Sequence, residues 1–249
     1  MRIAVIIPTA QDDAALQRSL ASLAELDPGP DEVIVVDGAA SASCQLACRA
    51  AGAVWLAGHP GRGGQLALGA ARARADLLWF VHADCQPAPE AVRVIREAIA
   101  AGALGGYFRF QFSGTRGPAK RFLEHCIAWR CRHGTVYGEQ GLFVTRAAYL
   151  ATPGFSVQPL FEQVALVRAL KRSGRFVALS VPVTVSPRRW ESEGYWRRIL
   201  VNRLLALGFL CGMAPARLAR WHGGVPTGAL PRPGHDGHSR SGGHQAGKG

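Results

Sequence analysis

Acidic and imidazole side chains directly follow two apolar runs in the first hundred residues. Asp37-Gly38 follows one run, and His82-Ala83-Asp84 follows the other. A carboxylate such as Asp37 accepts hydrogen bonds from a ribose or a base N–H, and glycine lets the backbone approach closely, although Asp-Gly is also a common turn. An imidazole and a carboxylate two residues apart at a strand end can hold a divalent ion that bridges two phosphates. The two segments therefore indicate a site for a nucleotide and a metal.

Two basic segments could complete such a site. The segment Gly61–Gly64 contains Arg62 and precedes an expected helix, so its backbone N–H groups and the guanidinium suit a phosphate. Arg188-Arg189-Trp190 offers two guanidiniums beside an aromatic ring, which suits neutralisation of a pyrophosphate under a stacking lid. A flexible or solvated loop is the alternative interpretation of each segment.

Two acid–amide pairs, Glu139-Gln140 and Glu162-Gln163, lie in the second half of the chain. A glutamate near an acceptor hydroxyl could act as its general base. Glu162 also opens an expected helix, where a carboxylate is favoured by the helix dipole alone. The sequence leaves both interpretations of Glu162 open.

Strands and helices alternate through the first hundred residues. Continuous apolar runs predict buried strands, and apolar residues at spacings of three and four predict helices between them. The expected strands are 3–7, 33–36, 53–56 and 77–81, and the expected helices lie around 16–23, 43–51, 64–75 and 88–101. This order predicts a right-handed, mostly parallel α/β sheet with its ligand at the carboxyl ends of the strands. The first strand is followed by no GxGxxG motif, which excludes a Rossmann dehydrogenase.

The second half has a different pattern. Alternation over 107–112 predicts a strand with one packed face, and later segments predict a mixture of helices and short strands. The expected elements are a helix at 118–132, a strand at 141–144, helices at 146–151 and 161–173, one or two strands within 176–186 and helices from about 194 to 221. Residues 223–249 are rich in Gly, Pro and His and are expected to form a disordered tail.

An apolar segment, 199–213, is flanked by arginines. It is too short to cross a bilayer, which needs roughly 20 residues. It could form an interfacial helix that touches a membrane surface, or a helix buried beneath the sheet. A lipid-linked acceptor would fit the first alternative.

The composition limits the class of protein. The 249-residue chain is 48% hydrophobic, which excludes a wholly disordered protein, and its net charge of +12 favours an anionic partner. No platform of aromatic and basic residues and no recognition helix appears, so a nucleic-acid partner is not expected. Without a signal peptide we expect a cytoplasmic protein with reduced thiols. Cys44 and Cys48, and Cys126 and Cys131, are spaced as core residues of helices.

Taken in order, the motifs resemble those of the family 2 glycosyltransferases of the GT-A fold. They are most similar to the small bacterial subgroup of selenodomain-associated transferases. The resemblance extends over roughly residues 1–222 through motifs that begin at Ile6, Val35, Gly61, His82, Tyr137, Gly154, Glu162 and Arg188. It implies a three-layer α/β/α sandwich with a mostly parallel central sheet, followed by C-terminal helices. It also implies a nucleotide-binding half (1–105), an acceptor half (106–193), C-terminal helices (194–222) and the tail (223–249).

The resemblance also implies which residues bind the donor, a UDP- or GDP-sugar. Pro8, Asp12 and Asp37 would hold the base and ribose, and Arg62 would face the diphosphate. Arg189 and Trp190 would assist the departing nucleoside diphosphate. The full set of implied nucleotide-binding residues is Pro8, Thr9, Asp12, Asp37, Gly38, Arg62, Gln65, Arg189 and Trp190.

For the metal and the chemistry, the resemblance points to a second set. Asp84 corresponds to the last carboxylate of the family's DxD motif, with His82 in place of the first, and these would hold Mn²⁺ or Mg²⁺. Glu162 would open the motif whose acid deprotonates the acceptor in an inverting transfer. The family usually has Asp where this chain has Gln163, which cannot accept a proton, so Glu162 or Glu139 would take that role.

Three functional hypotheses follow. The first is a metal-dependent, inverting sugar transferase that acts on an unidentified acceptor. The second is a degenerate, non-catalytic nucleotide-binding relative, which the glutamine at position 163 favours. The third is a basic protein that binds a membrane surface without catalysis.

Overall fold

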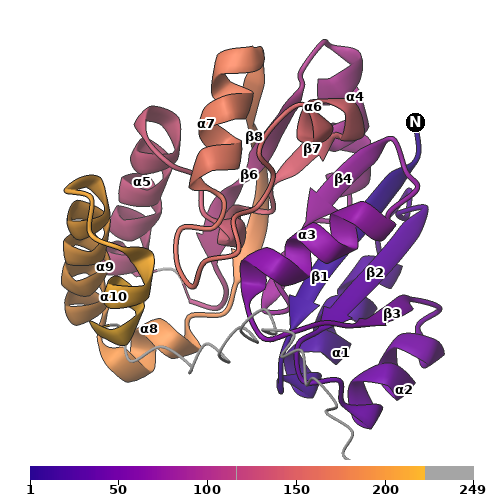
Figure 1. Cartoon of the computed structure of the whole chain (residues 1–249), viewed down its shortest axis with the longest axis horizontal. Coiled ribbons are helices and arrows are strands. Elements are labelled where there is room, and N and C mark those ends of the chain that lie inside the picture. Colours follow the sequence, from indigo (N-terminus) through magenta and orange to yellow (C-terminus); the bar gives the residue numbers. More distant parts are fainter. Residues whose placement is uncertain (116, 222–249) are drawn as a thin grey trace, which may run out of the picture.

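The computed structural model describes residues 1–115 and 117–221, so the predicted tail at 223–249 lies outside the described residues. One mixed sheet of eight strands runs through the chain in the order β3-β2-β1-β4-β7-β6-β8-β5 (Figure 1). The strands are Ile3–Thr9 (β1), Glu32–Asp37 (β2), Val54–Ala57 (β3), Leu77–Phe80 (β4), Cys85–Pro87 (β5), Gly105–Phe112 (β6), Phe143–Thr145 (β7) and Phe176–Val185 (β8).

Helices cover both faces of this sheet. In the first half they are Asp13–Ala24 (α1), Ala42–Ala50 (α2), Arg62–Arg72 (α3) and Ala91–Ala100 (α4). The later ones are Pro118–His133 (α5), a 3₁₀ turn Gly138–Gln140 (η1), Arg146–Leu150 (α6), Val164–Ser173 (α7), Arg188–Glu193 (α8), Tyr195–Leu210 (α9) and Pro215–Trp221 (α10). The connections through α1 and α2 and the connection through α3 run across the sheet in opposite directions. Right-handed crossovers therefore place α3 on the face opposite α1 and α2.

The centre of the sheet is parallel, as predicted from the apolar runs. Every residue of β1 is buried, and β1 pairs in parallel with β2 on one side and β4 on the other. The register places Thr9 beside Asp37. The carboxyl ends of β1, β2 and β4 thus meet at one edge, where the sequence placed its polar residues.

The second half of the sheet departs from the prediction in detail. The segment 176–186, where one or two strands are expected, forms one ten-residue strand, β8, whose pairing with β6 shifts register between Phe108 and Arg109. Cys85–Pro87, the segment directly after His82–Asp84, forms the short strand β5, which pairs antiparallel with β8. This strand and the turn η1 carry no apolar periodicity, and the sequence analysis did not predict them. The other expected elements are confirmed to within a few residues at their ends.

The C-terminal helices lie on the surface, at one side of the molecule (Figure 1). Leu205 is the buried residue of α9 and Leu218 that of α10. The alternative of a helix buried beneath the sheet is therefore wrong for 199–213. Among the residues that the structure describes, none of the helices combines the length and the hydropathy that a bilayer crossing requires.

Candidate active site

Asp37 lies at the end of β2 and is only 1% exposed. Its carboxylate accepts hydrogen bonds from the backbone N–H of Ala39 (2.9 Å) and of Ser41 (2.7 Å), and Trp55 Nε1 lies 3.4 Å away. Burial alone would raise the pKa of Asp37, but these hydrogen bonds outweigh it and hold the pKa below its ordinary value. Asp37 is thus a fixed carboxylate at the edge where the strands end.

Gln65 connects the two strands at this edge through hydrogen bonds. Its Nε2 donates to the carbonyl oxygens of Thr9 (2.7 Å) and Val36 (2.8 Å), and its side chain is buried. Gly38 lies directly beside it, since a Cβ on Gly38 would stand 3.1 Å from Gln65 Nε2. The structure therefore gives Gln65 a positioning role: it links the ends of β1 and β2.

The remaining donor-side residues of the first strand lie at the same edge. Pro8 and Thr9 are the last two residues of β1 and are buried. Asp12 is exposed and caps α1, because its Oδ1 accepts a hydrogen bond from Ala15 N at 3.1 Å. Its carboxylate has a local structural use that the sequence pattern did not indicate.

Arg62 and Glu162 face one another across the start of α3. Arg62 Nη1 lies 3.9 Å from Glu162 Oε1, and the side chains are 51% and 8% exposed. Burial raises the pKa of Glu162 and the Arg62 charge opposes that rise, with the net pKa above its ordinary value. A half-exposed guanidinium thus stands beside a buried carboxyl group whose basicity is increased.

The loop that carries Glu162 is held closely against α3. A Cβ on Gly63 would overlap the backbone oxygen of Ser156. The backbone N–H of Ser156 in turn donates to the backbone oxygen of Glu162 at 2.9 Å. Phe161, just before Glu162, has a positive φ of 64°, which is rare for a bulky residue. Its ring stacks on Phe209 of α9, with centroids 4.5 Å apart.

His82 and Asp84 line different cavities. His82 is 6% exposed, and a Cβ on Gly138 would overlap its ring. It lines a small cavity of about 10 Å³ together with Glu162 and Gln163. The buried Oε1 of Gln163 has no hydrogen-bond partner among the residues that the structure describes. That space is about the size needed for one water molecule. His82 thus lies beside Glu162 and Gln163, in a cavity other than the one that Asp84 lines.

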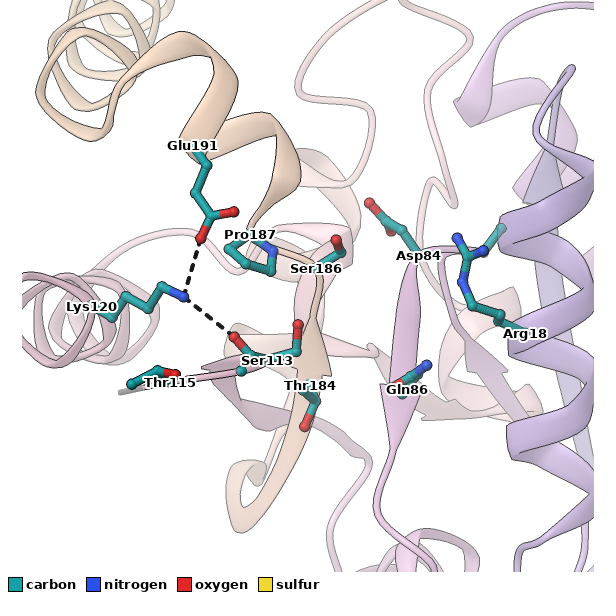
Figure 2. Close-up of a pocket in the computed structure, with 12 residues that line it drawn as sticks. Arg18, Asp84, Gln86, Ser113, Thr115, Lys120, Thr184, Ser186, Pro187 and Glu191 are labelled. Atoms are coloured by element: carbon teal, nitrogen blue, oxygen red, sulfur yellow. Dashed lines mark hydrogen bonds and ion pairs between the residues drawn. The ribbon is translucent and has the colours of Figure 1, made fainter. Parts of the chain in front are cut away.

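Asp84 lines a larger, polar cavity of about 540 Å³. Figure 2 shows Arg18 of α1 beside Asp84, with Lys120 of α5 and Glu191 of α8 across the cavity. Lys120 Nζ lies 3.3 Å from Glu191 Oε1. The other lining residues are Ala83, Gln86, Ser113, Gly114, Thr115, Thr184, Ser186 and Pro187.

No sequence motif predicts the cationic and hydroxyl residues of this cavity. Arg18, Lys120 and Glu191 come from three separate helices and belong to no short motif. One partial signal existed: Lys120 is one of only three lysines in the chain. Their convergence is a product of tertiary packing.

The structure gives other predicted residues different surroundings. Glu139 lies half-buried in η1, and its backbone oxygen lies 3.8 Å from Cys85 Sγ. Trp190 is 7% exposed and packs on Phe112, with centroids 5.5 Å apart, so its ring is part of the core and does not form an open lid. The side chain of Arg189 lies outside the part of the chain that the structure describes.

The donor atoms at Asp84 suit a cation that a ligand helps to hold. In the described residues, no three His, Cys, Asp or Glu side chains form a group that could hold a metal ion by themselves. Mg²⁺ and similar ions need no such cage, because one or two carboxylates plus phosphate oxygens and water suffice. Asp84, half-buried and lining the large cavity, fits that mode of binding.

Several solved structures share this fold. Glucosyl-3-phosphoglycerate synthase from Mycobacterium tuberculosis, in complex with Mn²⁺, uridine diphosphate and glucosyl-3-phosphoglycerate, is 20% identical, with a TM-score of 0.59 over 85% of this chain and 80% of that chain. The mannosyltransferase PcManGT from Pyrobaculum calidifontis, in complex with GDP-Man and Mn²⁺, is 18% identical, with a TM-score of 0.57 over 74% of this chain and 56% of that chain. S. aureus TarS 1-349 is 18% identical, with a TM-score of 0.60 over 75% of this chain and 61% of that chain.

These likenesses confirm the predicted α/β/α architecture of the GT-A fold. This chain spans less than two thirds of the length of the second and third of these proteins. No curated protein matches the chain. The model of one sequence family, Glycosyl transferase family 2, matches residues 4–145, which is more than half of the 249 residues. The chain therefore belongs to glycosyl transferase family 2.

Proposed function

We propose that this protein transfers a sugar from a UDP- or GDP-sugar to an acceptor hydroxyl, with inversion and with the help of Mn²⁺ or Mg²⁺. The observation that carries the proposal is the pair formed by Arg62 and the buried Glu162, 3.9 Å apart. It unites a phosphate-binding side chain at a helix N-terminus with a carboxyl group of raised pKa. Family membership and the Mn²⁺ and nucleotides named with the fold relatives support the same reaction class.

The donor would lie along the edge where β1, β2 and β4 end. Asp37, held as a carboxylate, would accept hydrogen bonds from the ribose or base. Arg62 would bind the diphosphate. Asp84 would hold the metal together with diphosphate oxygens, and the metal would neutralise charge on the leaving nucleoside diphosphate. His82, enclosed on the Glu162 side, takes no part in this metal assignment.

Glu162 would act as the general base and is favoured over Glu139, because Glu162 is buried beside Arg62 and its pKa is raised. A carboxylate at Glu162 would accept the proton of the acceptor hydroxyl as that oxygen attacks the sugar. A diphosphate that draws Arg62 away from Glu162 would remove the charge that lowers the pKa of Glu162. Donor binding would then make Glu162 a stronger base.

The cavity beside Asp84 would hold the part of the acceptor remote from the reacting hydroxyl, because Glu162, the proposed base, does not line it. Its volume of about 540 Å³ lies within the range of ligand pockets, roughly 300–1,000 Å³. Its hydroxyl groups, with Arg18 and Lys120, suit a hydroxylated acceptor that carries negative charge.

The order of motifs, rather than any contact, supports assignment to the selenodomain-associated subgroup.

Calorimetric titration of the full chain with UDP and with GDP tests the donor site. Each nucleotide is added with Mn²⁺ or Mg²⁺, and the titration is repeated with EDTA. We expect one nucleotide to bind in a metal-dependent manner and Asp84→Asn to weaken that binding at least about tenfold, since it removes the charged ligand. Glu97→Gln, an exposed residue of α4, is the charge-matched control. Metal-dependent binding by Asp84→Asn equal to that of the wild type would refute the assignment of Asp84.

A further inference from the structure

The outer face of α9 presents a row of large apolar side chains to solvent. Trp196, Leu200, Leu204, Leu207 and Leu210 recur at spacings of three or four residues, so they share one side of the helix. Each of them is 54–72% exposed. By the same spacing exposed Arg203 lies within this row, three residues after Leu200 and four before Leu207. An exposed apolar face of this kind marks an interaction surface.

Positive charge surrounds this face. The segment Tyr195–Trp221, which spans α9 and α10, contains five arginines and no aspartate or glutamate. Arg198 lies over the Trp190 ring, with 5.1 Å between its Cζ and the ring centroid, and the others are exposed. The exposed arginines are Arg197, Arg203, Arg217 and Arg220. The surface therefore combines exposed apolar side chains with charged side chains that are all basic.

Tryptophans stand at both ends of this surface. Trp196 is in the first turn of α9 and Trp221 is the last residue of α10, and each is 72% exposed. Tryptophan is favoured at the boundary between lipid headgroups and acyl chains. α9 has 16 residues, fewer than a bilayer crossing needs, so such a helix would lie along the boundary.

We propose that the outer face of α9, with the surrounding arginines and Trp221, binds the surface of a bilayer that contains anionic lipids. The leucines would enter the upper acyl region and the arginines would contact phosphate headgroups. A second copy of the chain fits less well, because a symmetric contact would bring the same arginines of both copies together with no acid to pair them. The proposal concerns binding and does not depend on the transferase reaction.

Sedimentation of the full chain with lipid vesicles tests this surface. Vesicles of phosphatidylcholine mixed with phosphatidylglycerol are compared with vesicles of phosphatidylcholine alone. We expect binding to the mixed vesicles that weakens as salt rises, and much weaker binding to the neutral ones. The double variant Leu200→Glu/Leu207→Glu should bind the mixed vesicles at least about tenfold more weakly, because acidic side chains replace inserted apolar ones.

Leu150→Glu is the matched control, because Leu150 is 67% exposed on α6, away from α9 (Figure 1). It should bind as the wild type does, and circular dichroism should show that all variants are folded. The proposal fails if the wild type does not sediment with mixed vesicles, or if the control loses as much binding as the double variant. It also fails if light scattering shows a dimer that only the double variant abolishes.

Discussion

At the scale of residues, Glu162 and Asp37 show how burial alone does not decide the charge of a carboxyl group. Both are buried, at 6% and 1% exposure. Asp37 receives backbone hydrogen bonds from Ala39 and Ser41, and its pKa falls. At Glu162 burial outweighs the Arg62 charge and one backbone hydrogen bond, and its pKa rises. One group is therefore suited to hold a ligand and the other to move a proton.

Glu162→Gln should lower turnover by about 10²-fold or more while donor binding changes little, since general-base catalysis is typically worth that much. Glutamine keeps the shape of the side chain and removes its proton acceptor. Steady-state kinetics and nucleotide titration on the same preparation measure the two quantities. Glu139→Gln is the parallel variant, and a loss confined to it would transfer the role of base to Glu139.

Arg62→Gln should move the acidic limb of the pH–rate profile to higher pH. The Arg62 charge favours the carboxylate form of Glu162, so its removal raises the pKa of Glu162 further and more base is needed to ionise it. The measurement is kcat/KM for the donor against pH, because that profile reports the protein before a diphosphate engages Arg62. Arg72→Gln, at the exposed end of α3, should leave the limb in place. An unchanged limb in Arg62→Gln would contradict the pairing.

At the scale of elements, the site depends on how closely α3 approaches the loop that precedes α7. Gly63 permits that approach, because any Cβ there would overlap the backbone oxygen of Ser156. Its neighbour Gly64 has open space at the same position. Two adjacent glycines in one helix therefore have different functions.

Gly63→Ala should displace the loop that carries Glu162 and reduce turnover at least about tenfold, because small displacements of catalytic groups are costly. Gly64→Ala gains the same helix propensity without the clash, so it should stay active and become more stable by about 0.4–1 kcal/mol. Activity assays and thermal unfolding of both variants check this. Equal activity in the two variants would show that the contact with Ser156 is unimportant.

Apart from β5, the elements of the first half of the chain could be predicted from the sequence, and those of the second half only in part. Runs such as Ile3–Ile7 are buried on both faces and leave a continuous apolar pattern. β5 has three residues and pairs with β8, about a hundred residues later, so no local pattern reveals it. The same holds for Lys120 and Glu191, which become neighbours only through packing of α5 and α8. The motifs predicted the residues at the strand ends. The packing roles of Gln65 and Trp190 could not be predicted, because they depend on contacts with residues distant in the sequence.

At the scale of the whole molecule, a donor that binds where β1, β2 and β4 end would link segments from distant parts of the chain. Asp37 at the end of β2, Arg62 at the start of α3 and Asp84 after β4 would be linked by one ligand and its metal. Any ligand that binds only the folded state stabilises it by mass action. Donor binding should therefore be measurable as an increase in the free energy of unfolding of the whole chain.

UDP or GDP at about 100 times its Kd, with Mn²⁺, should stabilise the fold by about 2.7 kcal/mol. For a chain of this size that shift corresponds to several degrees in Tm, about 2–4 °C per kcal/mol. EDTA should abolish the increase. Asp84→Asn should unfold near the wild-type temperature without ligand and show a much smaller increase with it. An increase that persists in EDTA would contradict metal-dependent donor binding.

The contact between Phe161 and Phe209 has a consequence for how the protein could be controlled. The ring of Phe161 joins the residue before Glu162 to α9, and its left-handed backbone conformation is one that a bulky residue keeps only when its surroundings enforce it. α9, which forms part of the outer surface, thus also supports the loop that carries Glu162, the proposed base. A ligand that moves α9 from outside would therefore change the position of Glu162 and the turnover rate, while the affinity for the nucleotide would stay the same. The outer surface of the protein would then control its activity.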